Sequence, residues 1–173
     1  MYFLEDFFEE TAKDDDSFCR KMFDLDDIPT NKLFQAARAF SEGSKALESC
    51  LIELWKNNLK TCSCCAGAAA TVRINSSCHT ESSRAFISME PENDIFGYLS
   101  QELLDDPLVI LNIVNRHPVI RFAGGREKIE SNLAKFKESI KTGKKDNEDA
   151  VLKKVTCLGV LSQNMDDSIK RRK

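Results

Sequence analysis

Apolar side chains recur at helical spacing near the start of the chain. Over residues 3–12 they form one stripe, and acidic side chains occupy the opposite side, which predicts a short amphipathic helix. The acidic run Asp14–Asp16 ends this pattern, and a second short apolar stripe follows it. We expect residues 1–28 to form an N-terminal helical arm. Such an arm either packs on its own domain or docks on a partner protein.

The next helical pattern extends from Thr30 to Asn58 across Gly43. Apolar residues keep their helical spacing on both sides of this glycine, so the pattern fits one kinked helix or two separate helices. The hydroxyl of Ser44 can cap the beginning of the second half. Asn57 and Asn58 can end it, because asparagine tolerates the left-handed conformation that is common at helix ends.

Strands are predicted where β-branched, aromatic and cysteine side chains replace the helical spacing. These segments are residues 59–66, 71–74, 84–89, 108–114 and 119–123. Residues 108–114 are the most hydrophobic stretch of the chain, which predicts a central strand. A polar turn then makes residues 119–123 the hairpin partner of this strand.

Further helices are predicted over residues 93–104, 125–142 and 147–164, with lysines at the negative end of the second one. The element order favours an α+β fold. We expect an antiparallel sheet of about four to five strands, built from two ββα-like units, on which N-terminal and C-terminal helices pack. The α+β core domain should cover residues 29–164, and residues 165–173 should form a basic tail.

The composition fits a globular core. The chain has 173 residues, of which 42% are hydrophobic and 31% are charged, and this is enough apolar material for folding. The net charge of −3, with both signs mixed, argues against a nucleic-acid partner. No apolar run approaches the ~20 residues of a membrane span, so no membrane partner is expected.

The cysteine count indicates an intracellular protein. Seven cysteines and an acidic N-terminus that lacks the features of a signal peptide favour reduced thiols. We expect a cytoplasmic location, in a bacterium or in the host cytosol if the chain is delivered as an effector.

Metal binding is the first chemistry that the thiol-rich segment 59–79 could support. Zinc needs four sulfur or nitrogen ligands, normally as two close pairs. Strand alternation would divide the three nearest thiols between two faces, with Cys62 and Cys64 on one face and Cys65 on the other. The adjacent residues Cys78 and His79 would also diverge. We expect no metal site and no cofactor, and a zinc-stabilised module is the alternative.

A nucleophilic thiol is the second chemistry that this segment could support. Cys64 or Cys65 lies where the predicted strand enters a turn of small residues, and His79 could serve as the base. The other histidine, His117, could take the same role. The candidate catalytic residues are therefore Cys64, Cys65 and His79. In the competing interpretation the cysteines are small, buried apolar side chains.

An anion-binding site is predicted at Arg121, Gly124, Gly125 and Arg126. A strand, a glycine pair and the beginning of a helix would place backbone N–H groups and the helix dipole near two arginines. A phosphate or a carboxylate of a partner would fit there. Simple turn chemistry is the alternative, because complete phosphate-loop and dinucleotide patterns are absent.

One stretch carries a resemblance. Residues 40–48 have the sequence FSEGSKALE, and the sequence CCAG follows at residues 64–67. This arrangement resembles uncharacterised bacterial and phage-associated proteins with the pattern F-S-E-G-S-x-x-L-E, a helix, and then T-x-x-C-C-x-G-H. Ala68 stands where the pattern has histidine, so chemistry of that histidine would be absent or supplied by His79. The resemblance implies a bacterial or phage source and no established activity.

The sequence contains no complete catalytic or cofactor pattern. We therefore expect a small protein-interaction domain of effector or inhibitor type, with a protein partner. The alternatives are a cysteine-dependent enzyme that uses Cys64 or Cys65 with His79, and the zinc-stabilised module.

Overall fold

The structure, a computed structural model, describes residues 30–71 and 84–155. Within them, four antiparallel strands form one sheet in the order β1-β2-β4-β3. The strands are β1 (Thr61–Cys65), β2 (Ala85–Met89), β3 (Val109–Val114) and β4 (His117–Phe122). The helices are α3 (Thr30–Phe40), α4 (Lys45–Lys56), α5 (Gln101–Asp105) and α6 (Arg126–Lys141), with short 3-10 helices η1 (Gly67–Ala69) and η2 (Phe96–Tyr98). The predicted α+β fold is confirmed.

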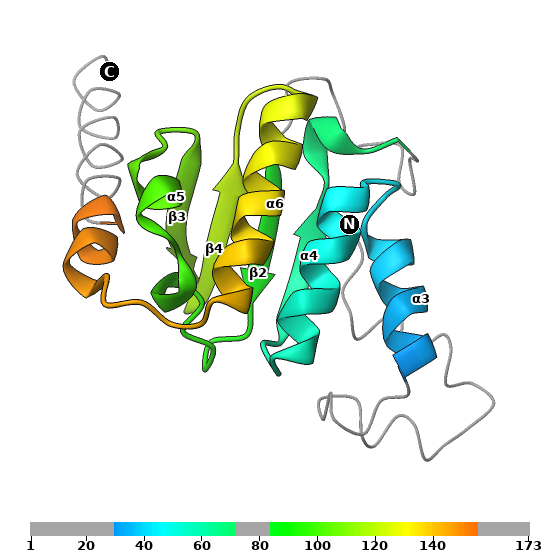
Figure 1. The fold of residues 1–173 in the computed structure, drawn as a ribbon, viewed down its shortest axis with the longest axis horizontal. Coiled ribbons are helices and arrows are strands. Elements are labelled where there is room, and N and C mark those ends of the chain that lie inside the picture. Colours follow the sequence, from blue (N-terminus) through cyan, green and yellow to red (C-terminus); the bar gives the residue numbers. More distant parts are fainter. Residues whose placement is uncertain (1–29, 72–83, 156–173) are drawn as a thin grey trace, which may run out of the picture.

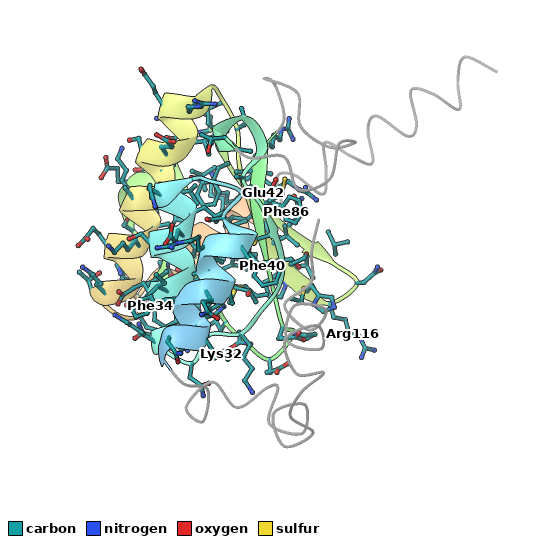
Figure 2. All side chains as sticks on the ribbon, turned by 90° about the vertical axis from the view of Figure 1, so that its right-hand side faces the viewer. Lys32, Phe34, Phe40, Glu42, Phe86 and Arg116 are labelled. Atoms are coloured by element: carbon teal, nitrogen blue, oxygen red, sulfur yellow. The ribbon has the colours of Figure 1, made fainter. Side chains whose placement is uncertain are left out.

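Helices α3, α4 and α6 lie on one side of the sheet (Figure 1), and Arg116 lies on the opposite side (Figure 2). Alternate residues of the strands enter the core below these helices, among them Ile87 of β2 and Ile120 of β4. The ring of Phe122 meets that of Phe136 on α6, with 6.0 Å between the ring centroids. We call the face away from these helices the second face.

The pattern between Thr30 and Asn58 forms two helices rather than one kinked helix. Glu42 and Gly43 have positive φ angles of 52° and 84°, which end the α3 direction. The Ser44 side chain then accepts the N–H of Leu47 at 3.2 Å and caps α4, as predicted. Asn58, with φ of 55°, follows the end of α4.

The predicted helix over residues 93–104 is wrong in its continuity. It is divided into η2 and α5, because Leu99 and Ser100 have extended backbone angles. The hydroxyl of Ser100 accepts the N–H of Leu103 at 3.4 Å, so this serine begins a new helix. Apolar side chains keep their helical spacing across this break, so the sequence pattern predicted one continuous helix.

The prediction that residues 108–114 form a central strand is also wrong for the described sheet. In the order β1-β2-β4-β3, the strand β3 lies at one end and pairs with β4. Val109 and Leu111 are core residues, whereas Ile113 and Val114 are exposed. The hydrophobicity of this stretch therefore combines a buried half with an exposed apolar end.

Several predicted segments lie outside the described residues. They include the arm 1–28, most of the strand 71–74, the loop with Cys78 and His79, and the tail 165–173. Residues 148–155 form the described part of the predicted final helix. The domain boundaries at residues 28 and 164 stay predictions.

Candidate functional site

A β-bulge near the beginning of β1 sets the direction of its cysteine side chains. The pairing with β2 shifts between Thr61 and Ser63, so Cys62 is an extra residue in the ladder. Strand alternation is interrupted at this point, and the prediction that Cys62 and Cys64 share a face is wrong. Cys64 belongs to the core, while Cys62 contacts Ser88.

Cys62 lies in a small polar cluster on the second face. Its Sγ is 3.0 Å from Ser88 Oγ and 3.5 Å from His117 Nδ1. Ser88 alternates with the core residues Ile87 and Met89 along β2, and so it projects to the second face. The Cys62 cluster, formed by Cys62, Ser88 and His117, thus brings a thiol, a hydroxyl and an imidazole together.

The hydrogen bonding of His117 decides what this cluster can do. Its Nδ1 lies 2.9 Å from the carbonyl oxygen of Met89. A carbonyl oxygen can only accept, so Nδ1 carries the proton and donates it. The same nitrogen faces the sulfur of Cys62 and therefore cannot remove a proton from it. This pair lacks the general-base geometry of a cysteine hydrolase, and the sulfur, at 3.5 Å, can at most share the Nδ1–H that Met89 accepts.

Cys64 is enclosed between β1 and the junction of α3 with α4. Its thiol donates to the carbonyl oxygen of Phe40, with an Sγ–O distance of 3.7 Å. Burial, with a smaller contribution from the charge of Glu42, raises the pKa of this thiol above its usual range. A thiol in such surroundings stays protonated at neutral pH. The environment favours a small core residue over a nucleophile.

Cys65 lies at the end of β1, opposite Phe86 of β2. Burial raises the pKa of its thiol to about 11, although the N–H of Gly67, which donates to Sγ at 3.4 Å, lowers it. The charge of Glu42 raises this pKa further. His79 lies outside the described residues, so its pairing with Cys64 or Cys65 stays a prediction.

The FSEGS and CCAG segments, which are separated in the sequence, meet in the structure. Glu42 is 6% exposed, and its Oε1 accepts the N–H of Ala66 at 3.2 Å. The carbonyl oxygen of Glu42 accepts the N–H of Thr71 at 2.9 Å. These bonds hold the positive φ of Glu42 and join the turn after β1 to the α3–α4 junction. In Figure 2, Phe34 lies near one end of α3 and Glu42 lies past the other end.

The zinc pattern has no complete ligand set in the described part of the chain. No three His, Cys, Asp or Glu side chains come together as a metal-binding group within residues 30–71 and 84–155. Cys62 and Cys64 point to opposite faces of the sheet. The remaining members of the pattern, Cys78 and His79, lie outside the described residues.

The two arginines of the predicted anion site are not brought together. Arg121 projects to the second face, where its Nε donates to Asn112 Oδ1 at 3.1 Å and its guanidinium lies 5.7 Å from the ring centroid of Phe86. Arg126, on the helix side, donates to two carbonyl oxygens near η1 at 3.4 and 3.3 Å. The sheet separates these guanidinium groups, because α6 packs on its other face.

The glycine pair before α6 serves backbone geometry. Gly124 has a φ of 100°, and a Cβ there would lie 3.1 Å from the side chain of Lys128. Gly125 occupies the N-cap position of α6 without a side-chain cap. The amine of Lys128 is engaged by Asp106 at 2.7 Å. These features favour the turn chemistry that was the alternative to an anion site.

Two exposed apolar side chains lie at the end of β3, on opposite faces of the sheet, and a third belongs to the helical residues 148–155. Ile113, Val114 and Leu152 are 61%, 43% and 67% exposed. They are three of the four exposed large hydrophobic residues in the described part of the chain, and the fourth is Phe34 on α3. Ile113 and Leu152 line a groove of about 370 Å³ between β3, η2 and the helical residues 148–155.

This β3-edge groove has an acidic rim. Asp94, Glu148 and Asp149 line it, and no lysine or arginine is found among its described lining residues. Phe96 and Val151 contribute apolar surface to the same groove. The groove therefore combines apolar walls with a cluster of negative charge.

The Cys62 cluster and the groove were missed by sequence reasoning for different reasons. The cluster depends on a bulge that no residue pattern in β1 marks. The chain has two histidines, so testing each of them against each cysteine was the available signal. The groove could have been suspected from Ile113, which continues the apolar run beyond its buried half and close to a polar turn.

No known protein assists the assignment, since no family model, curated protein or solved structure matches the chain. None of the helices in residues 30–71 and 84–155 is long and apolar enough to cross a membrane. The assignment of function therefore depends on the geometry of the β3-edge groove and of the thiols.

Proposed function

We propose that the chain is a protein-interaction domain that binds a basic, amphipathic segment of a partner protein in the β3-edge groove. The proposal is carried by Ile113 and Leu152, two exposed apolar side chains that line an acid-rimmed groove. Contiguous apolar surface bordered by polar groups is typical of a binding site. The proposal keeps the interaction domain that the sequence favoured and moves its docking region from the N-terminal arm to β3.

The charge of the groove selects the chemistry of the partner. Its three carboxylates favour a segment with lysine or arginine around an apolar anchor. Asp94 also faces Lys144 at 3.8 Å, but both side chains of this pair are exposed, so it neutralises little of the rim. A partner helix with apolar side chains at positions i, i+4 and i+7 matches a groove between a strand and a helix.

Titration of the isotope-labelled full chain with two synthetic helical peptides tests this proposal by NMR. One peptide carries lysine around an apolar face, and the other carries glutamate around the same face. We expect the basic peptide to shift the amide signals of Ile113, Leu152 and Val155, and the acidic peptide to leave them unchanged. Equal binding of both peptides, or shifts that avoid the groove, would contradict the proposal.

Two substitutions supply the matched comparison. Ile113→Asp removes an apolar anchor and should abolish binding of the basic peptide. Phe34→Ser removes the exposed apolar residue that lies away from the groove and should leave binding unchanged. A second copy of the chain is the competing occupant. A concentration-dependent dimer that Ile113→Asp dissociates would assign the groove to self-association and overturn the proposal.

The cysteine-dependent enzyme has less support in the described residues. Burial holds the pKa values of Cys64 and Cys65 high, and His117, which lies beside Cys62, donates its proton to a carbonyl oxygen. The exposed apolar groove and the protonated thiols therefore favour a binding function over a cysteine-dependent enzyme.

A further inference from the structure

A second site of different chemistry, the Cys62 cluster, lies on the second face and takes its residues from β1, β2 and β4. We propose that Cys62 is a thiol–disulfide exchange site that takes up a small disulfide, such as oxidised glutathione, as a mixed disulfide. Ser88 and His117 act as positioning residues for its sulfur. This inference does not depend on the binding function of the groove.

The donors around the sulfur carry the proposal. Ser88 Oγ lies 3.0 Å from Sγ, and the hydroxyl can rotate to donate to it. The Nδ1–H group of His117, held by Met89 O at 2.9 Å, lies 3.5 Å from the same sulfur. Both groups lie within hydrogen-bonding distance of the sulfur, so they can hold it in one position for attack on a disulfide. The thiolate is the nucleophile in disulfide exchange.

Access distinguishes Cys62 from the other described cysteines. Cys50, Cys64 and Cys65 are buried, whereas Cys62 is half-buried. Burial raises the pKa of each of these three thiols. The bulge in β1 turns Cys62 away from the core and toward the two donors. Within the described residues, Cys62 is therefore the cysteine that combines access with hydrogen-bond donors.

The exchange is balanced without any further reactant. The Cys62 thiol loses its proton to water, and the thiolate attacks one sulfur of the disulfide. A new S–S bond joins Sγ to that half, the original S–S bond breaks, and the other half leaves as a thiolate that takes up a proton. The Cys62 sulfur is oxidised and the released thiol is the reduced product.

The neighbouring cysteines cannot displace the bound thiol. Cys65 is three residues further along the strand, a distance of about 10 Å, which exceeds the span of a disulfide. Cys64 points to the opposite face of the sheet. Neither of these two neighbours in β1 can therefore release the bound thiol, and an external thiol can.

Incubation of the full chain with oxidised glutathione at neutral pH, followed by peptide mass mapping over time, tests the inference. We expect Cys62 to be modified before Cys64 and Cys65. Ser88→Ala and His117→Leu should each slow modification of Cys62 by about 2- to 4-fold, because each removes a hydrogen-bonding partner that positions the sulfur. Ser88→Thr and His117→Asn keep a donor and should restore most of the rate. Cys65→Ser is the matched control and should leave the rate at Cys62 unchanged.

A comparison without substitutions keeps the test decisive if a donor-free variant does not fold. Cys62 in the folded chain should react at least as fast as in the urea-unfolded chain, because the donors offset its partial burial. The inference is overturned if Cys62 reacts more slowly than in urea. It is also overturned if folded Ser88→Ala and His117→Leu react at the wild-type rate.

Discussion

The four described cysteines have the same side chain and different surroundings. Cys50 and Cys64 lie in the core, where burial raises the pKa of both thiols. Cys65 is also buried and has a pKa of about 11. Cys62 is half-buried and faces a hydroxyl and an imidazole N–H. Thiol reactivity follows such surroundings, so the residue type alone could not identify the reactive cysteine.

The buried hydrogen bond of Trp55 gives a first prediction at this scale. Its Nε1–H donates to Thr61 Oγ1 at 3.0 Å. Thr61→Val keeps the shape of the side chain and leaves a buried N–H group without its acceptor. We expect the free energy of unfolding to fall by about 1–3 kcal/mol, measured by urea denaturation with Trp55 emission. Thr71→Val, at an exposed position, is the control, and an equal loss there would contradict the argument.

Asp106 should shape the acid stability of the protein. Its carboxylate pairs with Lys128 at 2.7 Å and accepts the N–H of Leu108 at 2.9 Å and an N–H of Asn132 at 3.2 Å. The hydrogen bond from Lys128 is the largest cause that lowers the pKa of Asp106 from 3.8 to about 2. Because the folded pKa is lowered, the stabilisation is present above the ordinary pKa of 3.8 and is lost as the pH falls toward 2.

Asp106→Asn should remove this part of the pH dependence. We expect the variant to be less stable than the wild type by about 1–2 kcal/mol at neutral pH, and the difference to vanish as the pH approaches the folded pKa of Asp106. Urea denaturation over a pH series measures both quantities. Glu102→Gln breaks an ion pair whose glutamate is exposed and should cost less. A constant difference at every pH would show that the carboxylate charge is not responsible.

At the scale of elements, sequence patterns succeeded where local chemistry decides a boundary. The Ser44 cap and the glycine pair before α6 lie where they were predicted. Predictions failed where pairing with a segment distant in the sequence determines the local structure. The bulge at Cys62 is defined by pairing with β2, and the end position of β3 follows from strand order. The Cys62–His117 contact needs three strands in the right order, which no local pattern contains.

The end of α6 gives a prediction at this scale. The amine of Lys145 donates to the carbonyl oxygens of Ser139 and Gly143 at 2.7 Å each, and to Thr142 Oγ1 at 2.8 Å. A cation at the negative end of a helix is stabilising, so Lys145→Met should lower the free energy of unfolding by about 1 kcal/mol. Lys144→Met is the matched control, and hydrogen exchange at the last turn of α6 is the local readout. Equal effects of the two substitutions would contradict the capping role.

At the scale of the molecule, the sheet separates two surfaces of different chemistry. The β3-edge groove lies at one end of the strand order and the β1 strand with Cys62 at the other. The helix layer covers the core face between them (Figure 1). Cys62 and Ser88 lie on β1 and β2, neither of which pairs with β3, so substitutions of these two residues should add to those in the groove. Loss of peptide binding and loss of thiol exchange are therefore separable.

The core joins both halves of the sheet, which gives the last prediction. Phe136 on α6 packs on Phe122 of β4, while Trp55 on α4 belongs to the same hydrophobic cluster. Phe136→Ala should lower the free energy of unfolding by about 3–5 kcal/mol, and Phe136→Leu should cost less. In a single cooperative unit this loss appears equally in Trp55 emission and in far-ultraviolet circular dichroism during urea denaturation. A Trp55 transition that stays at its wild-type midpoint while the dichroism shifts would show that α4 and β1 unfold as a separate unit.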